Sequence, residues 1–329
     1  MVTTRSSHRI GACVALGLLA VSCSGGEPAS DAPSQAPEGS GELRSITVAE
    51  TTGLPSAFLT YGVQEGYFEE EGLDVTVDTS AGGAAAIPGL VNGSLQVAGS
   101  NVVSVLLAAQ QGLPLKIVAP GTGVGDDLEQ DFSRVMVLAD SPIQAPEDLA
   151  DANVSVNTLE NISEVSVRGS LENLGVDTSA MTFTELGFPD MLPALERGDI
   201  DAAFLIEPFA TLAAEQGARG ILSPYVGLGP NSQIGSYVMT AELAESDPEL
   251  VAAFQAGVAA TAESVTADEQ AFREALPEIA SLDPALIDEI QVPVWTGTVD
   301  RESLESIGEW MIEFDIMPAA PDYDTVVLD

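Results

Sequence analysis

Residues 88–98 read Pro-Gly-Leu-Val-Asn-Gly-Ser-Leu-Gln-Val-Ala, and residues 193–203 read Pro-Ala-Leu-Glu-Arg-Gly-Asp-Ile-Asp-Ala-Ala. Both stretches follow one layout, in which a leucine near the end of a helical segment precedes a glycine that stops the helix. An alternating strand follows the glycine, which lies five residues after the proline in each stretch. The repetition predicts two lobes built in the same way.

Outside these stretches, the chain from Arg44 onward alternates short strand-like runs with helical segments, a pattern typical of α/β proteins with parallel sheets. The strand-like runs lie at 46–48, 73–77, 95–98, 117–119, 135–138, 154–156, 181–186, 202–206 and 220–223. We therefore predict two Rossmann-like lobes with largely parallel sheets. Open sheets bind ligands at the carboxyl ends of their strands, so two facing lobes predict a cleft between them.

The first lobe is expected to comprise residues 44–138 and 239–329, and the second lobe residues 139–238. This division requires a hinge that the chain crosses twice. We place the outbound crossing at 134–138 and the return at 236–240. Three helical segments, 248–265, 269–279 and 301–314, are predicted after the return.

The N-terminus has the composition of a secretory signal. Arg5 and Arg9 precede an apolar stretch, residues 10–21, which is too short for a membrane span of about 20 residues. We predict a signal peptide at 1–22 and a flexible linker at 23–43, whose Ser, Gly, Pro and Glu residues bury little apolar area. Residues 19–23, Leu-Ala-Val-Ser-Cys, resemble a bacterial lipobox with Cys23 as the lipidated residue. An ordinary exported thiol at Cys23 is the alternative.

These N-terminal features predict an extracytoplasmic protein that a lipid anchors to the outer face of the cytoplasmic membrane. His8 is the only histidine, and Cys13 would be removed with the signal peptide. The processed chain would then have no His-based catalytic group and no internal disulfide. We expect a protein that is not an enzyme and that holds neither a cofactor nor a metal.

The sequence of 329 residues contains 51 Asp and Glu against 10 Lys and Arg, a formal net charge of -41. Nucleic-acid backbones are held by clustered basic residues, so this balance argues against a nucleic-acid partner. A hydrophobic content of 45% predicts a folded body despite the charge. Adaptation to salt, or solubility, explains the acidic surface better than attraction of a ligand does.

Several short motifs resemble, in their order and spacing, the solute-binding proteins of ABC importers in the nitrate, sulfonate, taurine and thiamine-precursor group. The motifs are Gly-Tyr-Phe-Glu-Glu-Glu-Gly-Leu at 66–73, Ser-Ala-Gly-Gly at 80–83, Gly-Leu-Pro-Leu-Lys at 112–116, the segment 141–149, Gly-Asp-Ile-Asp-Ala-Ala at 198–203 and Glu-Pro-Phe at 207–209. The likeness covers nearly all of 44–315. It implies the type II periplasmic binding protein fold, in which two lobes close on a small solute and deliver it to a membrane permease.

Two other functions stay open beside solute import. An enzyme of pyrimidine synthesis shares this fold, but its chemistry uses a histidine that the processed chain lacks. A lipoprotein that senses a ligand without transporting it is the second alternative. For either binding function we expect a monomer.

Ligand contacts in a two-lobe binder come from loops after strands and from helix N-termini. The residues predicted on this basis are Thr51, Thr52, Ser80, Gly82, Gly83, Asn101 and Thr122 in the first lobe, and Asn157, Thr158, Glu207 and Tyr237 in the second lobe or near the return crossing. Helix capping and turn formation are the alternative role for the Thr51, Thr52, Asn157 and Thr158 side chains. For Gly82 and Gly83 the alternative is a tight turn.

Glu207 ends the apolar run 202–206, where a half-buried carboxylate is costly without a partner. The partner is either an amine or ring N–H of the solute, which the resemblance favours, or a backbone amide or arginine of the protein. Large aromatic residues can stack on a flat ligand but are more often part of the core. They are Phe188, Phe209, Trp295 and Trp310.

No Arg or Lys lies in the predicted cleft loops, whereas Glu50, Asp126, Glu160 and Glu207 lie in or beside them. Because arginine holds sulfonate and nitrate groups best, we predict a neutral or cationic nitrogen-containing solute, such as a heterocycle. A nest of backbone N–H groups can bind an oxyanion without arginine, so a sulfonate, nitrate or taurine remains the alternative.

Overall fold

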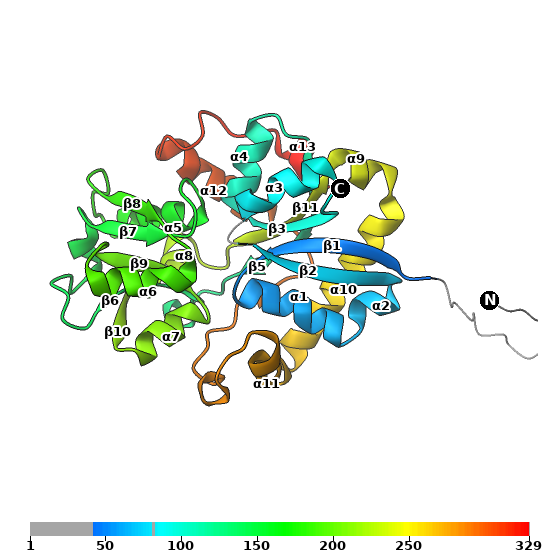
Figure 1. The fold of residues 1–329 in the computed structure, drawn as a ribbon. Helices are drawn as coiled ribbons and strands as arrows, with labels where there is room; N and C mark the ends of the chain where they lie inside the picture. The colour runs from blue at the N-terminus through cyan, green and yellow to red at the C-terminus, as the bar shows by residue number, and fades with distance from the viewer. Residues whose placement is uncertain (1–41, 81–82, 329) are drawn as a thin grey trace, which may run out of the picture. The chain divides into compact units, whose positions relative to one another are not determined.

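The computed structural model describes residues 42–80 and 83–328, with the backbone alone described at Ser80. The predicted signal peptide and nearly all of the predicted linker, including Cys23, lie outside the described residues. Figure 1 shows two sheets, one mostly in the blue and cyan part of the chain, with one yellow-green strand, and one in the green part. Each sheet has five strands.

The strand order of the first sheet is β2-β1-β3-β11-β4, and that of the second is β8-β7-β9-β6-β10 when read in the matching direction. The first sheet contains β1 (Arg44–Thr51), β2 (Leu73–Ser80), β3 (Val97–Asn101), β4 (Leu115–Pro120) and β11 (Gly235–Thr240). The second contains β6 (Ser133–Leu138), β7 (Asn153–Val156), β8 (Thr182–Glu185), β9 (Ala202–Ile206) and β10 (Ala218–Leu222).

Both sheets have four strands in one direction and one strand against them. In the first sheet β1 is parallel to β2 and β3, while β11 is antiparallel to β3 and β4. In the second, β7 is parallel to β8 and β9, while β6 is antiparallel to β9 and β10. The prediction of two α/β lobes with largely parallel sheets is therefore confirmed.

The repeated stretches occupy matching places in the two sheets. Helix α3 (Gly83–Asn92) leads into β3, and α6 (Phe188–Arg197) leads into β9, the strand in the corresponding position. Each helix ends at a glycine with left-handed backbone, Gly93 with φ 78° and Gly198 with φ 73°. Glycine is suited to this conformation because it has no Cβ to clash, which explains why both stretches place it there.

The two strands predicted as crossings are instead central members of the sheets. β6 lies between β9 and β10, and β11 lies between β3 and β4. The chain leaves the first sheet in residues 121–132 and returns to it in 229–234. Both segments lie closer to the N-terminus than the lobe boundaries expected at 138/139 and 238/239. Val135, Val137 and Val238 of β6 and β11 are fully buried, as expected of strands inside a sheet.

The two real crossings run side by side as a hydrogen-bonded ribbon. The Gly121 N–H donates to the Gly235 carbonyl at 2.9 Å, and the Ile234 N–H donates to the Thr122 carbonyl at 2.8 Å. A third segment joins the ribbon where β12 (Val294–Trp295) pairs with β5 (Thr122–Gly123). The buried Gln233 side chain accepts the Asp300 N–H at 2.7 Å and so ties the ribbon to the segment before α12.

Helices cover both faces of the sheets. They are α1 (Leu54–Gln64), α2 (Tyr67–Glu70), α4 (Val102–Gln110), α5 (Ile162–Asn173), α7 (Phe209–Glu215), α8 (Pro224–Leu228), α9 (Ala241–Ser246), α10 (Pro248–Ala267), α11 (Glu269–Ile279), α12 (Arg301–Glu313) and α13 (Tyr323–Val326). Short 3-10 turns lie at Leu128–Gln130, Pro146–Leu149 and Pro284–Leu286. The three helices predicted after the return strand are confirmed as α10, α11 and α12.

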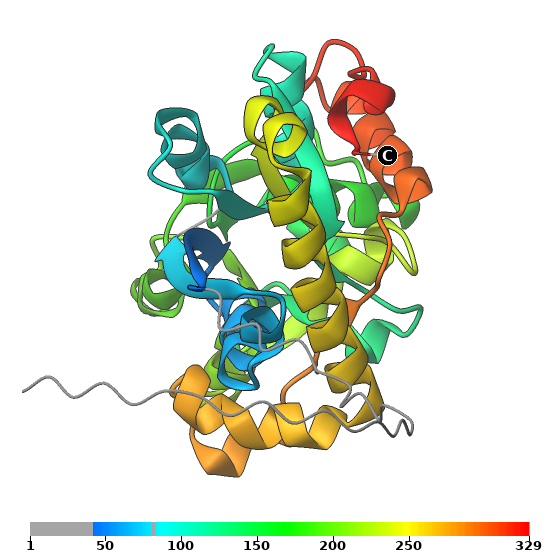
Figure 2. The same cartoon turned by 90° about the vertical axis from the view of Figure 1, so that its right-hand side faces the viewer.

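Helix α10, the long yellow helix in Figure 2, belongs to the core of the first lobe. Its length and composition would suffice for a membrane span, but it packs against α1 and α2 and buries Leu250, Phe254 and Val258. Core helices of soluble proteins have the same property. Buried apolar residues of the two lobes also form one continuous cluster. Helix α12 contributes to it, because it contacts both α4 of the first lobe and α5 of the second.

Replacement of Gly121 by alanine is expected to destabilise the protein. A Cβ at Gly121 would lie 2.7 Å from the carbonyl carbon of Gly235, so one strand of the ribbon would have to move. Overpacking of this kind costs about 1–3 kcal/mol. We expect Gly121→Ala to lower the thermal midpoint by several degrees, measured by differential scanning calorimetry.

Gly125→Ala is the matched control, since a Cβ at Gly125 meets nothing within 4 Å and the residue lies in the same crossing. Equal midpoints for the two variants would contradict the importance of the close approach at Gly121.

Candidate ligand-binding site

A cavity lies between the two sheets, where the carboxyl ends of several strands meet. Its empty volume is about 480 Å³, the open mouth included. The first sheet and the crossings contribute Glu50, Thr51, Ser100, Asn101, Thr122 and Ser236, among others. The second lobe contributes Phe132, Asn157, Ser163, Phe188, Ile206 and Tyr225.

The topology explains why these residues meet. Glu50 and Thr51 end β1, Ser100 and Asn101 end β3, and Ile206 ends β9. Since parallel strands present their carboxyl ends at one edge of a sheet, the loops that follow them converge there. The cleft predicted between the lobes therefore corresponds to a cavity lined from both sheets.

Four of the predicted ligand residues line the cavity: Thr51, Asn101, Thr122 and Asn157. Asn101 also caps α4, because its Oδ1 accepts the Ser104 N–H at 2.9 Å. The Asn157 Oδ1 accepts the Asn161 side-chain amide at 2.8 Å and the Ser163 hydroxyl at 2.9 Å. These bonds fix both side chains at the cavity wall, so capping and a ligand contact are compatible roles for them.

Five predicted residues do not line the cavity: Thr52, Gly83, Thr158, Glu207 and Tyr237. Gly83 packs so closely on Ser100 that an added Cβ would lie 1.9 Å from the Ser100 Oγ. This contact supports a packing role for the glycine. Gly82 and the side chain of Ser80 lie outside the described residues, so their predicted contacts stay predictions.

Glu207 is buried, with 3% of its surface exposed, and protein groups occupy its carboxylate. Oε1 accepts the Thr211 hydroxyl at 3.0 Å and the Gln291 N–H at 3.3 Å, while Oε2 accepts the Thr211 N–H at 3.2 Å. Burial nevertheless raises the pKa of Glu207 to about 7. Backbone amides of Thr211 and Gln291 are thus partners of the kind that the sequence left as the alternative, and a contact of Glu207 with a solute stays a prediction.

Sequence reasoning placed Glu50 in or beside the cleft loops but did not include it among the ligand residues. Glu50 lines the cavity with 5% of its surface exposed, and its Oε1 accepts the Thr51 N–H at 2.6 Å. The hydroxyl of Tyr237, itself 1% exposed, also bonds to this carboxylate. Burial raises the pKa of Glu50 to about 7, although the bonds from Thr51 and Tyr237 oppose the rise. The available signal was an acidic residue at the carboxyl end of a strand.

Gly99 makes room for Glu50 on the neighbouring strand. A Cβ at Gly99 would lie 1.9 Å from the Glu50 Oε2, so the carboxylate rests directly on the backbone of β3. The Tyr237 hydroxyl bonds to the same carboxylate, but Tyr237 itself does not line the cavity, although the sequence predicted a ligand contact for it.

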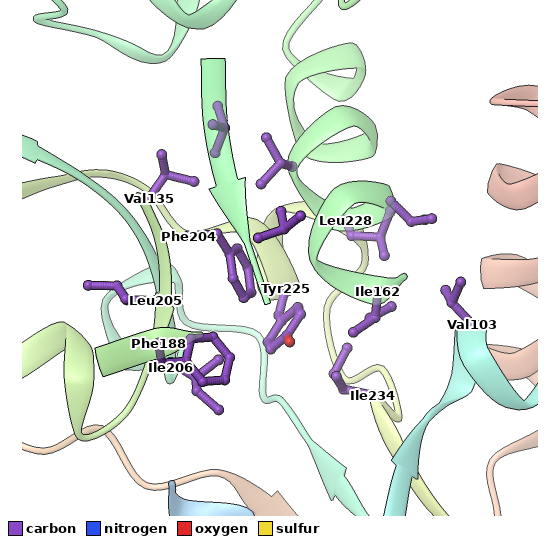
Figure 3. Packing of buried hydrophobic residues seen from close by; sticks show 14 of the residues in the cluster. Val103, Val135, Ile162, Phe188, Phe204, Leu205, Ile206, Tyr225, Leu228 and Ile234 are labelled. Atoms are coloured by element: carbon purple, nitrogen blue, oxygen red, sulfur yellow. The ribbon is translucent and has the colours of Figure 1, made fainter. Parts of the chain in front are cut away.

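Aromatic and aliphatic side chains form the second-lobe wall. Phe132 packs on Tyr225 with ring centroids 5.1 Å apart, and Phe188 stacks on Phe209 at 5.5 Å. Figure 3 shows Phe188 beside Ile206 and Tyr225 beside Phe204. The two tryptophans lie elsewhere, Trp295 stacked on Phe58 and Trp310 on Phe314. Of the aromatic residues considered from the sequence, only Phe188 lines the cavity.

Glu50 is the one charged side chain in the described lining, which contains no Lys or Arg. The N-termini of α1, α4, α5 and α6 also begin at the cavity, through Pro55, Asn101, Ile162 and Phe188. Helix N-termini carry partial positive charge, but Asn101 and Asn161 side chains already cap α4 and α5. Residues 42–80 and 83–328 hold no cluster of three or more His, Cys, Asp or Glu suited to a metal.

Two of the buried glutamates, Glu50 and Glu207, predict how stability depends on pH. Each has a pKa raised from 4.5 to about 7, so the folded state binds more protons than the unfolded state between these values. The free energy of unfolding should therefore fall as pH rises from 4.5 through about 7. At about 1.4 kcal/mol per pKa unit, the loss approaches about 3 kcal/mol for each group.

Urea unfolding at pH 5 and pH 8 measures this loss. Glu50→Gln and Glu207→Gln should each reduce the difference between the two pH values, while Glu196→Gln, at an exposed position, should leave it as in the unmodified protein. An unchanged difference in both buried variants would contradict the prediction.

Residues 55–271 match the family described as NMT1/THI5 like. The taurine-binding periplasmic protein of Escherichia coli (strain K12) is 24% identical over 209 residues, which cover 64% of this chain and 62% of that protein. The formylaminopyrimidine-binding protein of Halalkalibacterium halodurans is 28% identical over 131 residues, 40% of this chain and 38% of the relative. Both matches thus span less than two thirds of the relative.

The solved alkanesulfonate-binding protein SsuA of Xanthomonas axonopodis pv. citri, bound to MOPS, has a TM-score of 0.73 at 15% identity. The superposition covers 88% of this chain and 100% of that one. At this identity the likeness shows a shared fold, that of the periplasmic binding proteins, as predicted. Because the family match extends over more than half of the 329 residues, the chain belongs to the NMT1/THI5-like family.

Proposed function

We propose that the protein is the extracytoplasmic solute-binding component of an ABC importer. It holds a small solute in the cavity between the two sheets and releases it unaltered to a membrane permease. The observation that carries this proposal is the cavity itself. It is lined by strand ends of both lobes and by the two hydrogen-bonded crossings that join them. Relatives that are named for their ligands are binding proteins, which supports the same function.

Catalysis is the weaker candidate. His8, Cys13 and Cys23 are the only histidine and cysteines of the sequence, and all precede the body that forms the cavity. Glu50 is the one titratable carboxylate of the described lining, so a pair of acid and base groups for hydrolysis is lacking there. A sensing lipoprotein without transport would use the same cavity and differs only in its partner.

The solute class proposed is a nitrogen-containing heterocycle or organic cation. A lining with Glu50 and without Lys or Arg supports this class. A sulfonate of the taurine type is the second candidate, which the taurine-binding relative and the helix N-termini at the cavity favour.

A solute screen with a blocked cavity tests the proposed function. Thermal-shift screening of residues 24–329 should find small solutes that raise the unfolding temperature, and mass spectrometry should recover each solute unchanged after release. Thr51→Trp should abolish the shift because Thr51 lines the cavity. Thr60→Trp on α1, outside the lining, is the matched control and should keep it. Recovery of a chemically altered solute would show an enzyme instead.

Anchoring through Cys23 is a separate part of the proposal. In a bacterial host that expresses the full chain, Cys23→Ser should move the protein from the membrane fraction to the soluble extracytoplasmic fraction, measured by immunoblotting. Cys13→Ser, which changes a residue of the predicted signal peptide, should leave the protein in the membrane fraction. Membrane association that survives Cys23→Ser would contradict lipidation at this residue.

A further inference from the structure

Glu50 has a carboxylate that protein donors satisfy only in part. A carboxylate accepts about four hydrogen bonds. The Thr51 N–H takes one position on Oε1 at 2.6 Å, and the hydroxyls of Tyr237 and Thr51 also bond to the group. The same side chain lines the cavity, so its remaining acceptor capacity is open to a solute.

None of the elements packed around Glu50 supplies a positive charge. β2 places Thr79 opposite Glu50, and the neighbouring Asp78 is exposed. β3 contributes Gly99 and Ser100, and β11 contributes Tyr237, whose pKa the buried site raises above its ordinary value. The helices that follow β1 and β3, α1 and α4, contain no charged residue.

An ionised Glu50 is therefore a buried charge without a counter-ion from the described residues. Such a charge is costly, and a cationic or N–H group of a ligand would lower the cost by pairing with it. An anionic ligand group at the same place would add repulsion. The wall across the cavity, Phe132, Phe188 and Tyr225, suits an apolar or flat body.

We propose that Glu50 determines the specificity of the cavity by selecting solutes that present an N–H donor, either an ammonium group or a heterocyclic amine, to its carboxylate. This inference rests on the proposed solute-binding function, and it assigns to Glu50 the discrimination between solutes. Glu207, buried in the same way, does not take part because it does not line the cavity.

Binding of such a solute should release a proton. Because burial brings the pKa of Glu50 to about 7, part of the population holds a proton at neutral pH before the ligand arrives. The ligand's N–H group replaces that proton, which passes to the solvent. Affinity for a permanently cationic solute should then rise with pH up to about 7 and level off above it.

The experiment uses pairs of solutes that differ in the N–H group. Taurine is paired with isethionate, in which a hydroxyl replaces the ammonium group, and 4-amino-2-methylpyrimidine is paired with 2,4-dimethylpyrimidine. Further amine and hydroxyl pairs from the thermal-shift library complete the set. Titration calorimetry of residues 24–329 gives affinities at pH 6, 7 and 8, and repetition in buffers of different ionisation enthalpy gives the number of protons released.

We expect the N–H member of the binding pair to bind at least tenfold tighter and to release about half a proton at pH 7. Glu50→Gln should reduce the preference to less than threefold and abolish proton release. Glu207→Gln, the matched control, should keep both. Tyr237→Phe removes a bond that lowers the pKa of Glu50, so it should keep the preference and move the pH profile of affinity upward.

The possible results separate this inference from the function on which it rests. Equal binding of both members of a pair, or a preference that Glu50→Gln leaves intact, overturns the role of Glu50 while solute binding stands. Affinity for taurine, whose ammonium group stays charged between pH 6 and 8, that falls as pH rises also overturns it, because that sign belongs to an anion next to Glu50. A complete absence of binding across the library contradicts both proposals.

Discussion

The close backbone contact of the two crossings is the constraint on which the rest of the structure depends. Gly121 and Gly235 approach so nearly that neither has room for a side chain, and hydrogen bonds between 121–124 and 232–235 hold the segments together. Each crossing feeds one antiparallel strand, β6 or β11, into the centre of a sheet. The contact thereby fixes the two sheets relative to each other where the chain passes from one to the other. Strand ends of both sheets surround one cavity there.

Most of the fold could be predicted from the sequence because it is local. Strand runs such as 73–77 and 202–206, and the helix at 269–279, follow from the periodicity of apolar residues within a few residues of one another. The repeated stretches indicated matched lobes correctly. Sheet order is different, since the partner of a strand lies far away in sequence. β6 and β11 have the buried apolar residues of central strands, but only their partners show which sheet each one joins.

The separation of strand partners in sequence also explains why some predicted site residues line the cavity and others do not. Thr51, Asn101 and Asn157 follow strands, so their place at the sheet edge follows from α/β topology. Tyr237 was expected near the cleft as part of a crossing. Because β11 is instead a central strand, its side chains alternate between faces, and Tyr237 packs against Phe254 in the core with its hydroxyl toward Glu50.

Glu50 and Glu207 show why burial alone does not identify a ligand residue. Both end buried strands, and both have a pKa raised to about 7 by loss of solvent. The difference lies in their position relative to the cavity. Thr211 and Gln291, which is distant in sequence, donate to the Glu207 carboxylate, and this group does not line the cavity. Glu50 accepts bonds from Thr51 and Tyr237 and still faces the cavity without a cation. Of two buried carboxylates with similar hydrogen bonding, only the one that lines the cavity is placed to meet a solute.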